Sequence, residues 1–572
     1  MSATNLSSLI WSIAELLRGN YKQSDYGNVI LPFTLLRRLD SVLAPTKDAV
    51  LSVVNANKSA PPAMIDQLCL RASGQTFYNT SRFDVPKLLG DADQLKLNLL
   101  DYLNGFSKNA GDIFDKYEFL NTIQKLDSEN LLFLVVQKFA SVDLSPKTIS
   151  NMEMGQAFEE LIRRFAELSN ETAGEHFTPR EVIRLMVDLL FHLDDNVLSK
   201  GGTIRTLYDC CAGTGGMLSV ADEHLFKQNP NAKLALYGQE LNAESYAVCK
   251  ADMLIKGQDV GNIIFGNTLT ADGHRNLKFD YQLCNPPFGV EWKKVEKQVR
   301  DEFEQLGHAG RFGPGLPRVS DGSLLFLLHM VSKMRPASEG GTRIGIVLNG
   351  SPLFTGGAGS GESEIRRYLL ENDLVEAIVA LPTDMFYNTG ISTYVWILSN
   401  HKEAKRKGKV QLINATELWQ KMKKSLGSKR KELSTDHIAE IVKLHGTFEA
   451  GELVKILDTT DFGYTTVTVE RPLLDADGKP QQNNRGKTLA DASKRDTENI
   501  PLKTDIDVYF KKEVLPHVPD SWMDRSKDKV GYEIPFNRYF YKYVPPRPLE
   551  VIDAELKDKV AKIQELLKEI IL

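Results

Sequence analysis

Four consecutive residues, Asn285, Pro286, Pro287 and Phe288, combine an amide, two rings without N–H groups and an aromatic face. Consecutive prolines cannot donate hydrogen bonds or continue a strand, so they form a rigid corner without donors. The Asn285 side-chain oxygen and the Pro286 carbonyl can accept hydrogen bonds from both N–H groups of an aromatic amine. These hydrogen bonds make the amine nitrogen more nucleophilic. Phe288 offers a face on which a flipped base can stack. The corner predicts methylation of an amine; the alternative is a strand-ending turn that buries Phe288.

A glycine-rich turn lies upstream of this corner. Residues 209–216 read Asp-Cys-Cys-Ala-Gly-Thr-Gly-Gly, after an apolar run and before a helical pattern. Glycines let the backbone turn sharply and approach a ligand, and a helix N-terminus presents unpaired N–H groups to it. A dinucleotide-binding turn or a purely structural turn can have the same pattern. We predict that the turn binds a nucleotide-type cofactor through Asp209, Gly213, Thr214, Gly215 and Gly216.

Two further polar residues end the next two apolar runs. Glu240 ends the second run, where a carboxylate can accept hydrogen bonds from both hydroxyls of a ribose. Asn267 follows the third run, where a polar side chain can reach the edge of an adenine ring. A sulfonium methyl donor carries its own leaving group, and the amine can lose its proton after the attack, so a general base is not strictly needed. Catalysis would then rest on alignment and preorganised acceptors. We predict no metal site.

The elements that must hold these residues alternate between strands and helices. Strands are predicted at 203–208, 234–239, 262–265, 279–284, 343–348, 374–381 and 394–398. Helices are predicted between several of them, at 216–227, 243–256, 323–334 and 362–370. Strands that are apolar on both sides and alternate with helices are typical of a mainly parallel sheet covered by helices. The sequence therefore predicts a Rossmann-like, doubly wound α/β domain.

The length of 572 residues and the changes of pattern predict three parts. Residues 1–150 have helical spacing throughout and predict an all-helical N-terminal domain. Residues 151–470 would form the catalytic domain, and residues 471–572 a linker and a C-terminal helical extension. An apolar stripe from Leu549 to Ile570 carries charges on its opposite face. This helix either folds back onto its own domain or docks against a partner.

Composition and charge limit the class of protein. With 42% hydrophobic and 25% charged residues and no apolar run of membrane-spanning length, the chain is expected to be soluble. The five cysteines lack C-x-x-C spacing, which argues against disulfides and a zinc site and favours the cytoplasm. A net charge of -5 is unfavourable for binding DNA phosphates. The segment 402–431 is the best local basic surface, although an ordinary solvated face has similar charges.

Taken together, the chain resembles the modification (methyltransferase) subunit of type I restriction-modification enzymes, with the gamma-type order of adenine methyltransferase motifs. The resemblance rests on residues 21–27, the glycine turn, Glu240, the Asn-Pro-Pro-Phe corner and residues 531–536. It implies methylation of the exocyclic amine of adenine in double-stranded DNA, with S-adenosyl-L-methionine as cofactor. It also implies that a segment upstream of the turn lines the methionine end of this cofactor: Gly174, Glu175, His176, Phe177, Thr178 and Pro179.

The resemblance implies partners as well. A specificity subunit would read a split DNA site, two copies of this chain would flank it, and an ATP-dependent restriction subunit can join. The chain departs from the family pattern at Cys210 and Cys211, where Pro and Ala are usual, and at Asn267, where Asp is usual. An amide at that position loses the charge-assisted part of a hydrogen bond to adenine, so cofactor affinity is the property affected.

Two other functions share parts of this pattern. The corner also suits methylation of a glutamine side chain in a protein, which the helical N-terminal part and the C-terminal stripe disfavour. A catalytically silent scaffold that holds a specificity subunit on DNA would keep the fold. The departures at Cys210 and Asn267 favour the scaffold, whereas the intact corner from Asn285 to Phe288 disfavours it. We expect a site-specific adenine DNA methyltransferase.

Overall fold

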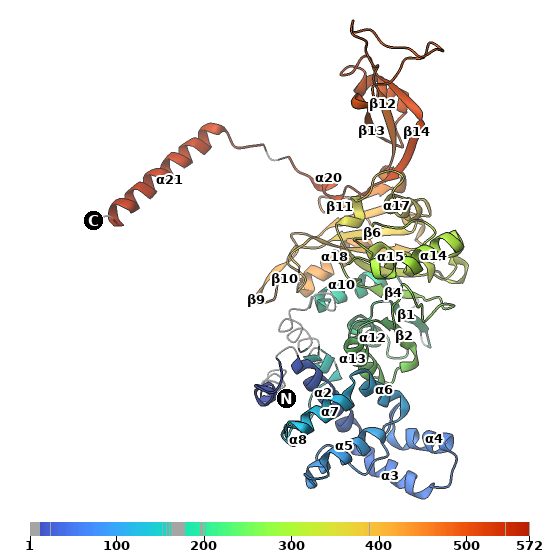
Figure 1. Cartoon of the computed structure of the whole chain (residues 1–572), viewed down its shortest axis with the longest axis vertical. Helices are drawn as coiled ribbons and strands as arrows, with labels where there is room; N and C mark the ends of the chain where they lie inside the picture. The colour runs from blue at the N-terminus through green and yellow to red at the C-terminus, as the bar shows by residue number, and fades with distance from the viewer. Residues whose placement is uncertain are drawn as a thin grey trace. The chain divides into compact units, whose positions relative to one another are not determined.

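The computed structural model divides by its contacts into two units, Met1–Ile534 and Pro535–Leu572 (Figure 1). No helix in the described parts of the chain is long and apolar enough to cross a membrane. The structure describes residues 12–22, 25–151, 153–155, 157–158, 161, 178–194, 198–200, 202–387, 389–543 and 545–570.

The N-terminal part is helical, as predicted. Its helices are α2 (Tyr26–Leu43), α3 (Lys47–Ala56), α4 (Pro62–Ser73), α5 (Leu95–Asn104), α6 (Lys108–Lys116), α7 (Phe119–Ser128) and α8 (Leu132–Ala140). They enclose aromatic side chains such as Phe33, whose ring stacks on that of Phe139 at a centroid distance of 5.5 Å. Lys250 of helix α13 (Ala243–Ile255) pairs with Asp112 of α6 at 2.9 Å. In addition, one continuous hydrophobic core extends from these helices to the sheet.

The central element is a nine-stranded sheet of order β11-β8-β6-β7-β5-β4-β1-β2-β3. All pairs are parallel except those that involve β7 and β11. Strands β1 to β7 lie where the sequence predicts strands, whereas β8 and β11 were not predicted. The strands are β1 (Ile204–Asp209), β2 (Lys233–Glu240), β3 (Ile263–Phe265), β4 (Tyr281–Cys284), β5 (Arg343–Asn349), β6 (Val375–Ala380), β7 (Thr393–Ser399), β8 (Lys409–Asn414) and β11 (Val454–Asp458).

Helices cover the sheet, and β4, β6 and β7 are buried along their whole length. Helix α10 contacts α12, α18 and β5, whereas α15 contacts α17 and β5. Because residues of a strand alternate between the two faces, complete burial requires cover on both faces. The predicted α/β class is confirmed. The covering helices include α10 (Arg180–Phe191), α12 (Gly216–Gln228), α15 (Ser323–Ser332), α17 (Gly361–Glu371) and α18 (Thr435–Thr447).

The strand order reverses between β1 and β4. From β1 the chain proceeds to β2 and β3 on one side, and from β4 to β5 on the other. The two strands are parallel, with Leu207 opposite Tyr281 and Tyr208 opposite Gln282. Ligands of open α/β sheets bind at the carboxyl ends of the strands at such a reversal. The glycine turn after β1 and the Asn-Pro-Pro-Phe corner after β4 therefore lie side by side.

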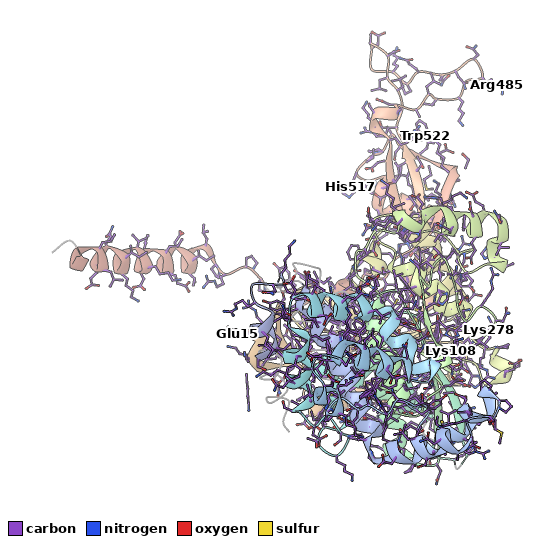
Figure 2. The ribbon with its side chains drawn as sticks, turned by 60° about the horizontal axis from the view of Figure 1, so that its bottom comes forward. Glu15, Lys108, Lys278, Arg485, His517 and Trp522 are labelled. Atoms are coloured by element: carbon purple, nitrogen blue, oxygen red, sulfur yellow. The ribbon has the colours of Figure 1, made fainter. Side chains whose placement is uncertain are left out.

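A small antiparallel sheet follows, in the order β13-β12-β14. Its strands are β12 (Gly463–Glu470), β13 (Asp496–Pro501) and β14 (Trp522–Tyr532). Residue 470, where the sequence predicts a domain boundary, is the last residue of β12, and β12 pairs with two strands beyond it. The contacts divide the chain after Ile534. A long irregular loop joins β12 to β13, and Figure 2 shows Arg485 near the outer end of this loop.

The second unit contains α20 (Phe536–Phe540) and α21 (Leu549–Ile570). Helix α21 matches the predicted apolar stripe. The stripe residues Leu549, Leu556, Val560, Ile563 and Leu567 are 50–73% exposed. Exposed apolar side chains in a continuous row are typical of a surface that binds another protein.

Candidate active site

A cavity of about 700 Å³ opens beside the carboxyl ends of β1, β2 and β4. This size suits a small-molecule cofactor. Four predicted residues are sequence neighbours of lining residues but do not line the cavity themselves: Pro179, Gly215, Pro286 and Phe288. Four others lie outside the described residues: Gly174, Glu175, His176 and Phe177. The predicted residues that line the cavity are Thr178, Asp209, Gly213, Thr214, Gly216, Glu240, Asn267, Asn285 and Pro287.

The glycine turn depends on backbone conformations that other residues rarely adopt. Gly213 has a φ of 53° and Gly215 a φ of 83°. A Cβ atom on Gly215 would also lie 2.9 Å from the sulfur of Cys249. Helix α12 begins at the next residue, Gly216, so its free N–H groups face the end of the turn. A substitution at Gly215 would therefore strain the turn and displace α13 as well.

Glu240 holds the turn together. One of its carboxylate oxygens accepts a hydrogen bond from the Gly213 N–H at 2.8 Å, and the other accepts from the Asn242 N–H at 2.7 Å. The side chain is only 8% exposed. Because a carboxylate oxygen has two acceptor sites, each oxygen keeps one for a ligand. The sequence predicted a ribose ligand here but not the two backbone N–H groups.

Asp209 and Asn267 face the same cavity. Burial, reinforced by the nearby Cys210 and Glu240, raises the pKa of Asp209 well above its usual value. The Asn267 side-chain oxygen accepts a hydrogen bond from the Leu269 N–H at 2.9 Å. Its oxygen is thereby used within the loop, and the side-chain NH2 group is the remaining donor for a ligand.

Asn285 has one satisfied and one unsatisfied side-chain group. Its NH2 group donates to the Thr178 hydroxyl at 2.9 Å. Its oxygen Oδ1 is buried and has no hydrogen-bond partner in the described part of the protein. An unpaired buried acceptor costs about 1–3 kcal/mol, so natural proteins rarely keep one without a function. The amide is thus oriented by Thr178 and presents a free acceptor beside the cavity.

The rest of the corner is apolar. Pro286 is buried, and Pro287 and Phe288 are half-buried. The Phe288 ring meets that of Phe386 edge to face, with a centroid distance of 5.8 Å and an interplanar angle of 75°. Phe386 belongs to the loop between β6 and β7, so the corner is supported from the neighbouring part of the same sheet edge.

The sequence did not reveal two other residues of the site. Trp292 lines the cavity and donates its indole N–H to the Arg318 carbonyl at 2.9 Å. Arg311 donates to the carbonyls of Thr268 and Leu269, both at 2.8 Å, and pairs with Glu302 at 2.6 Å. Arg311 therefore fixes the loop that follows Asn267. Neither residue belongs to a recognisable spacing, so only the folded chain reveals them.

The basic segment 402–431 does not form one surface. Lys402 pairs with Asp373, Arg406 is fully buried, and Lys429 pairs with Glu181. The remaining charges concentrate on the hairpin of β9 (Gln420–Leu426) and β10 (Lys429–Glu432). The exposed residues Lys421, Lys423, Lys424 and Arg430 have no ion-pair partner among the described residues.

Comparison with known proteins identifies the family. Residues 150–464 match the family described as N-6 DNA Methylase. The chain belongs to this family. Residues 6–139 match the HsdM N-terminal domain. The family assignment confirms the prediction of an adenine-specific DNA methyltransferase and argues against a methyltransferase for protein glutamine. The predicted resemblance to type I modification subunits is confirmed by both matches.

Individual relatives agree with this assignment. The chain is 27% identical over 466 residues to the type I restriction enzyme MjaIX methylase subunit of Methanocaldococcus jannaschii, with 77% of each chain covered. A methyltransferase subunit of a type I restriction-modification system from Streptococcus thermophilus has a similar structure, with a TM-score of 0.60 and 22% identity. That match covers 80% of this chain and 96% of the other. The structural likeness supports the methyltransferase fold.

Proposed function

We propose that this chain is the modification subunit of a type I restriction-modification assembly and methylates a flipped adenine with S-adenosyl-L-methionine. The observation that carries this proposal is the buried, unpaired Oδ1 of Asn285 beside the cavity. The target amine is a donor that fits such an acceptor. The relatives named as type I methylase subunits support the assembly.

The corner would act on the amine through two acceptors. Asn285 Oδ1 and the Pro286 carbonyl would each accept a hydrogen bond from one N–H group of the amine. These two hydrogen bonds would hold the nitrogen lone pair towards the cavity. Thr178 keeps the amide in this orientation through the NH2 group of Asn285. When bound, S-adenosyl-L-methionine supplies an electrophilic methyl group. Because the acceptors are fixed before the reaction, little reorganisation is needed during transfer.

The cofactor would lie along the glycine turn. Glu240 has one free acceptor site on each oxygen for the two ribose hydroxyls. The Asn267 NH2 group suits an acceptor nitrogen on the adenine edge. Asp209, Thr214 and Gly216 line the remainder of the cavity. Residues 174–179 would hold the methionine end, as the resemblance implies.

The target base must leave the duplex before its amine reaches Asn285. Phe288 is half-buried and its ring is fixed by the edge contact with Phe386. A fixed ring loses little freedom when a base stacks on it, and stacking offsets part of the cost of flipping. We assign Phe288 to stacking and Pro287 to keeping the corner rigid.

The basic hairpin of β9 and β10 is our candidate for contact with DNA phosphates. It follows β8, which is parallel to β6 and β4 through the sheet, so it begins at the same edge as the corner. The Ser428 N–H donates to the Tyr387 carbonyl at 2.7 Å, next to Phe386. Lysines on this hairpin would meet the backbone close to the flipped base.

Sequence recognition would come from partners. The exposed stripe of α21 is our candidate surface for a specificity subunit. A second copy of this chain would serve the other half of a split site, and an ATP-dependent restriction subunit would join the same assembly. Because α21 is amphipathic, a specificity subunit would dock through the apolar side chains of its stripe rather than through charged residues.

The test is to express the chain with and without its candidate specificity subunit in a host that lacks adenine methylation. Direct sequencing would map modified adenines, with Asn285→Ala as the control. We expect N6-methyladenine at one recurring split site, only with the partner and only with Asn285. Unmodified DNA despite a soluble complex would favour the silent scaffold.

A further inference from the structure

Three of the five cysteines meet beside the cavity, and two of them, Cys210 and Cys211, line it. Cys210 and Cys211 belong to the glycine turn, and Cys284 ends β4. The sulfur atoms of Cys210 and Cys284 are 3.4 Å apart, and all three sulfur atoms lie within 4.8 Å of one another. Cys210 and Cys284 are buried, and Cys211 is half-buried. The methyl-transfer account uses none of these thiols.

The sheet register brings the cysteines together. Leu207 pairs with Tyr281 and Tyr208 with Gln282, so the same register places Cys210 opposite Cys284. Neighbouring strands are about 4.8 Å apart, which makes side chains at opposite positions meet. These two residues are 74 positions apart in the chain. The spacing of cysteines along the sequence therefore gave no indication of a metal site.

The dimensions of the thiol cluster suit a tetrahedral metal ion. Zinc binds thiolate sulfur at about 2.3 Å, which separates two sulfur ligands by roughly 3.8 Å. The observed sulfur atoms, within 4.8 Å of one another, can reach this arrangement by small side-chain movements. Two of the three cysteines, Cys210 and Cys211, line the cavity, so a fourth ligand can come from solvent.

We propose that Cys210, Cys211 and Cys284 bind one thiophilic metal ion, Zn²⁺. On binding, the three thiols release three protons to solvent and three zinc–sulfur bonds form, with no change of oxidation state. Thiolate ligands favour zinc over magnesium or calcium, which prefer oxygen. The bound ion would form part of the cavity wall. None of the three thiols is assigned a role in the proposed methyl transfer, although Cys210 and Cys211 line the same cavity.

The test uses Co²⁺ as a spectroscopic probe for the site. The full chain is reduced, freed of metal with a chelator and titrated anaerobically with Co²⁺. We expect one equivalent to bind, with sulfur-to-cobalt charge-transfer absorption and the visible bands of tetrahedral cobalt, and Zn²⁺ to displace it. The readout does not depend on methyl transfer, so an inactive enzyme would still report on the site.

Variants locate the ligands. Cys284→Ser and Cys211→Ser should each lower the charge-transfer intensity by about a third, because each removes one of three thiolate ligands. Cys69→Ala, a buried free cysteine of α4, is the matched control and should leave the spectrum unchanged. Failure of the folded, reduced protein to give a thiolate–cobalt spectrum would overturn the proposal.

Discussion

Glu240 and Asn285 carry oxygen acceptors on the same cavity, but the fold uses them differently. Both oxygens of Glu240 accept backbone N–H groups, from Gly213 and Asn242. The oxygen of Asn285 has no partner among the described residues, although it is buried. Glu240 therefore stabilises the glycine turn itself, whereas Asn285 Oδ1 keeps its acceptor capacity for a donor from outside the described residues.

This difference separates two kinds of contribution. A group that is satisfied before binding shapes the site and sets its affinity. A group that is satisfied only by the reacting amine contributes where the reaction occurs, and interactions that strengthen in the transition state raise the rate. We therefore expect changes at Asn285 to lower the rate and changes at Glu240 to lower cofactor affinity.

The largest effect is expected for Asn285→Ala. Removal of a preorganised polar group from a catalytic site costs roughly 100- to 1000-fold in rate. The dissociation constant of the cofactor should stay within about fivefold of the wild-type value, which corresponds to a change of less than about 1 kcal/mol. Methylation of a duplex oligonucleotide and calorimetry of cofactor binding measure the two quantities. A variant that binds the cofactor poorly but methylates normally at saturation would break the comparison.

Glu240→Gln should have the next largest effect. Glutamine keeps one acceptor oxygen but places an NH2 group against the second backbone N–H. Loss of a hydrogen bond to a charged group costs about 1.5–3 kcal/mol, which corresponds to about 10- to 100-fold weaker cofactor binding. Calorimetric titration checks the affinity. An unchanged dissociation constant would show that the two backbone hydrogen bonds of Glu240 do not shape the cofactor site.

Thr178→Val should have a smaller effect, because Thr178 acts through Asn285. Without the hydroxyl, the Asn285 NH2 group loses its acceptor and the amide loses its fixed orientation. One neutral hydrogen bond is worth about 0.5–1.5 kcal/mol, so the rate should fall about threefold to tenfold. Thr178→Ser keeps the hydroxyl and should restore the rate. Equal losses in both variants would mean that the methyl group, not the hydroxyl, is required.

The hairpin lysines should affect the chemical step least. Changing Lys421, Lys423 and Lys424 to Ala should reduce the slope of log affinity against log salt by about 2 to 3, since each phosphate contact contributes about 0.9. The rate at saturating DNA should stay unchanged. Fluorescence anisotropy over a salt series measures the slope, and Lys407→Ala, an exposed lysine outside the hairpin, is the control. An unchanged slope would remove the hairpin from the DNA interface.

Much of the fold could be predicted because strands buried on both faces leave continuous apolar runs. Thr393–Ser399 is such a strand, with an apolar run from Tyr394 to Leu398. Strand β8 was missed because Lys409 and Gln411 interrupt its apolar residues within a segment read as basic. The antiparallel position of β7 between β5 and β6 was also not predicted, since apolar runs carry no information on strand direction.

The candidate site could be predicted only where its residues are close together in the sequence. The glycine turn and the Asn-Pro-Pro-Phe corner are short motifs whose backbone requirements are visible in their residue types. The bond from Asn285 to Thr178 and the contact of Cys210 with Cys284 join residues 107 and 74 positions apart. Such contacts depend on strand order and register, which the sequence alone did not specify.

The most direct test is a single-turnover methylation experiment with Asn285→Ala and Glu240→Gln side by side, over a range of cofactor concentrations. We expect Glu240→Gln to approach the wild-type rate as cofactor becomes saturating, and Asn285→Ala to remain slow at every concentration. Recovery of Asn285→Ala at high cofactor, or failure of Glu240→Gln to recover, would contradict the assignment of Asn285 to the amine and Glu240 to the cofactor.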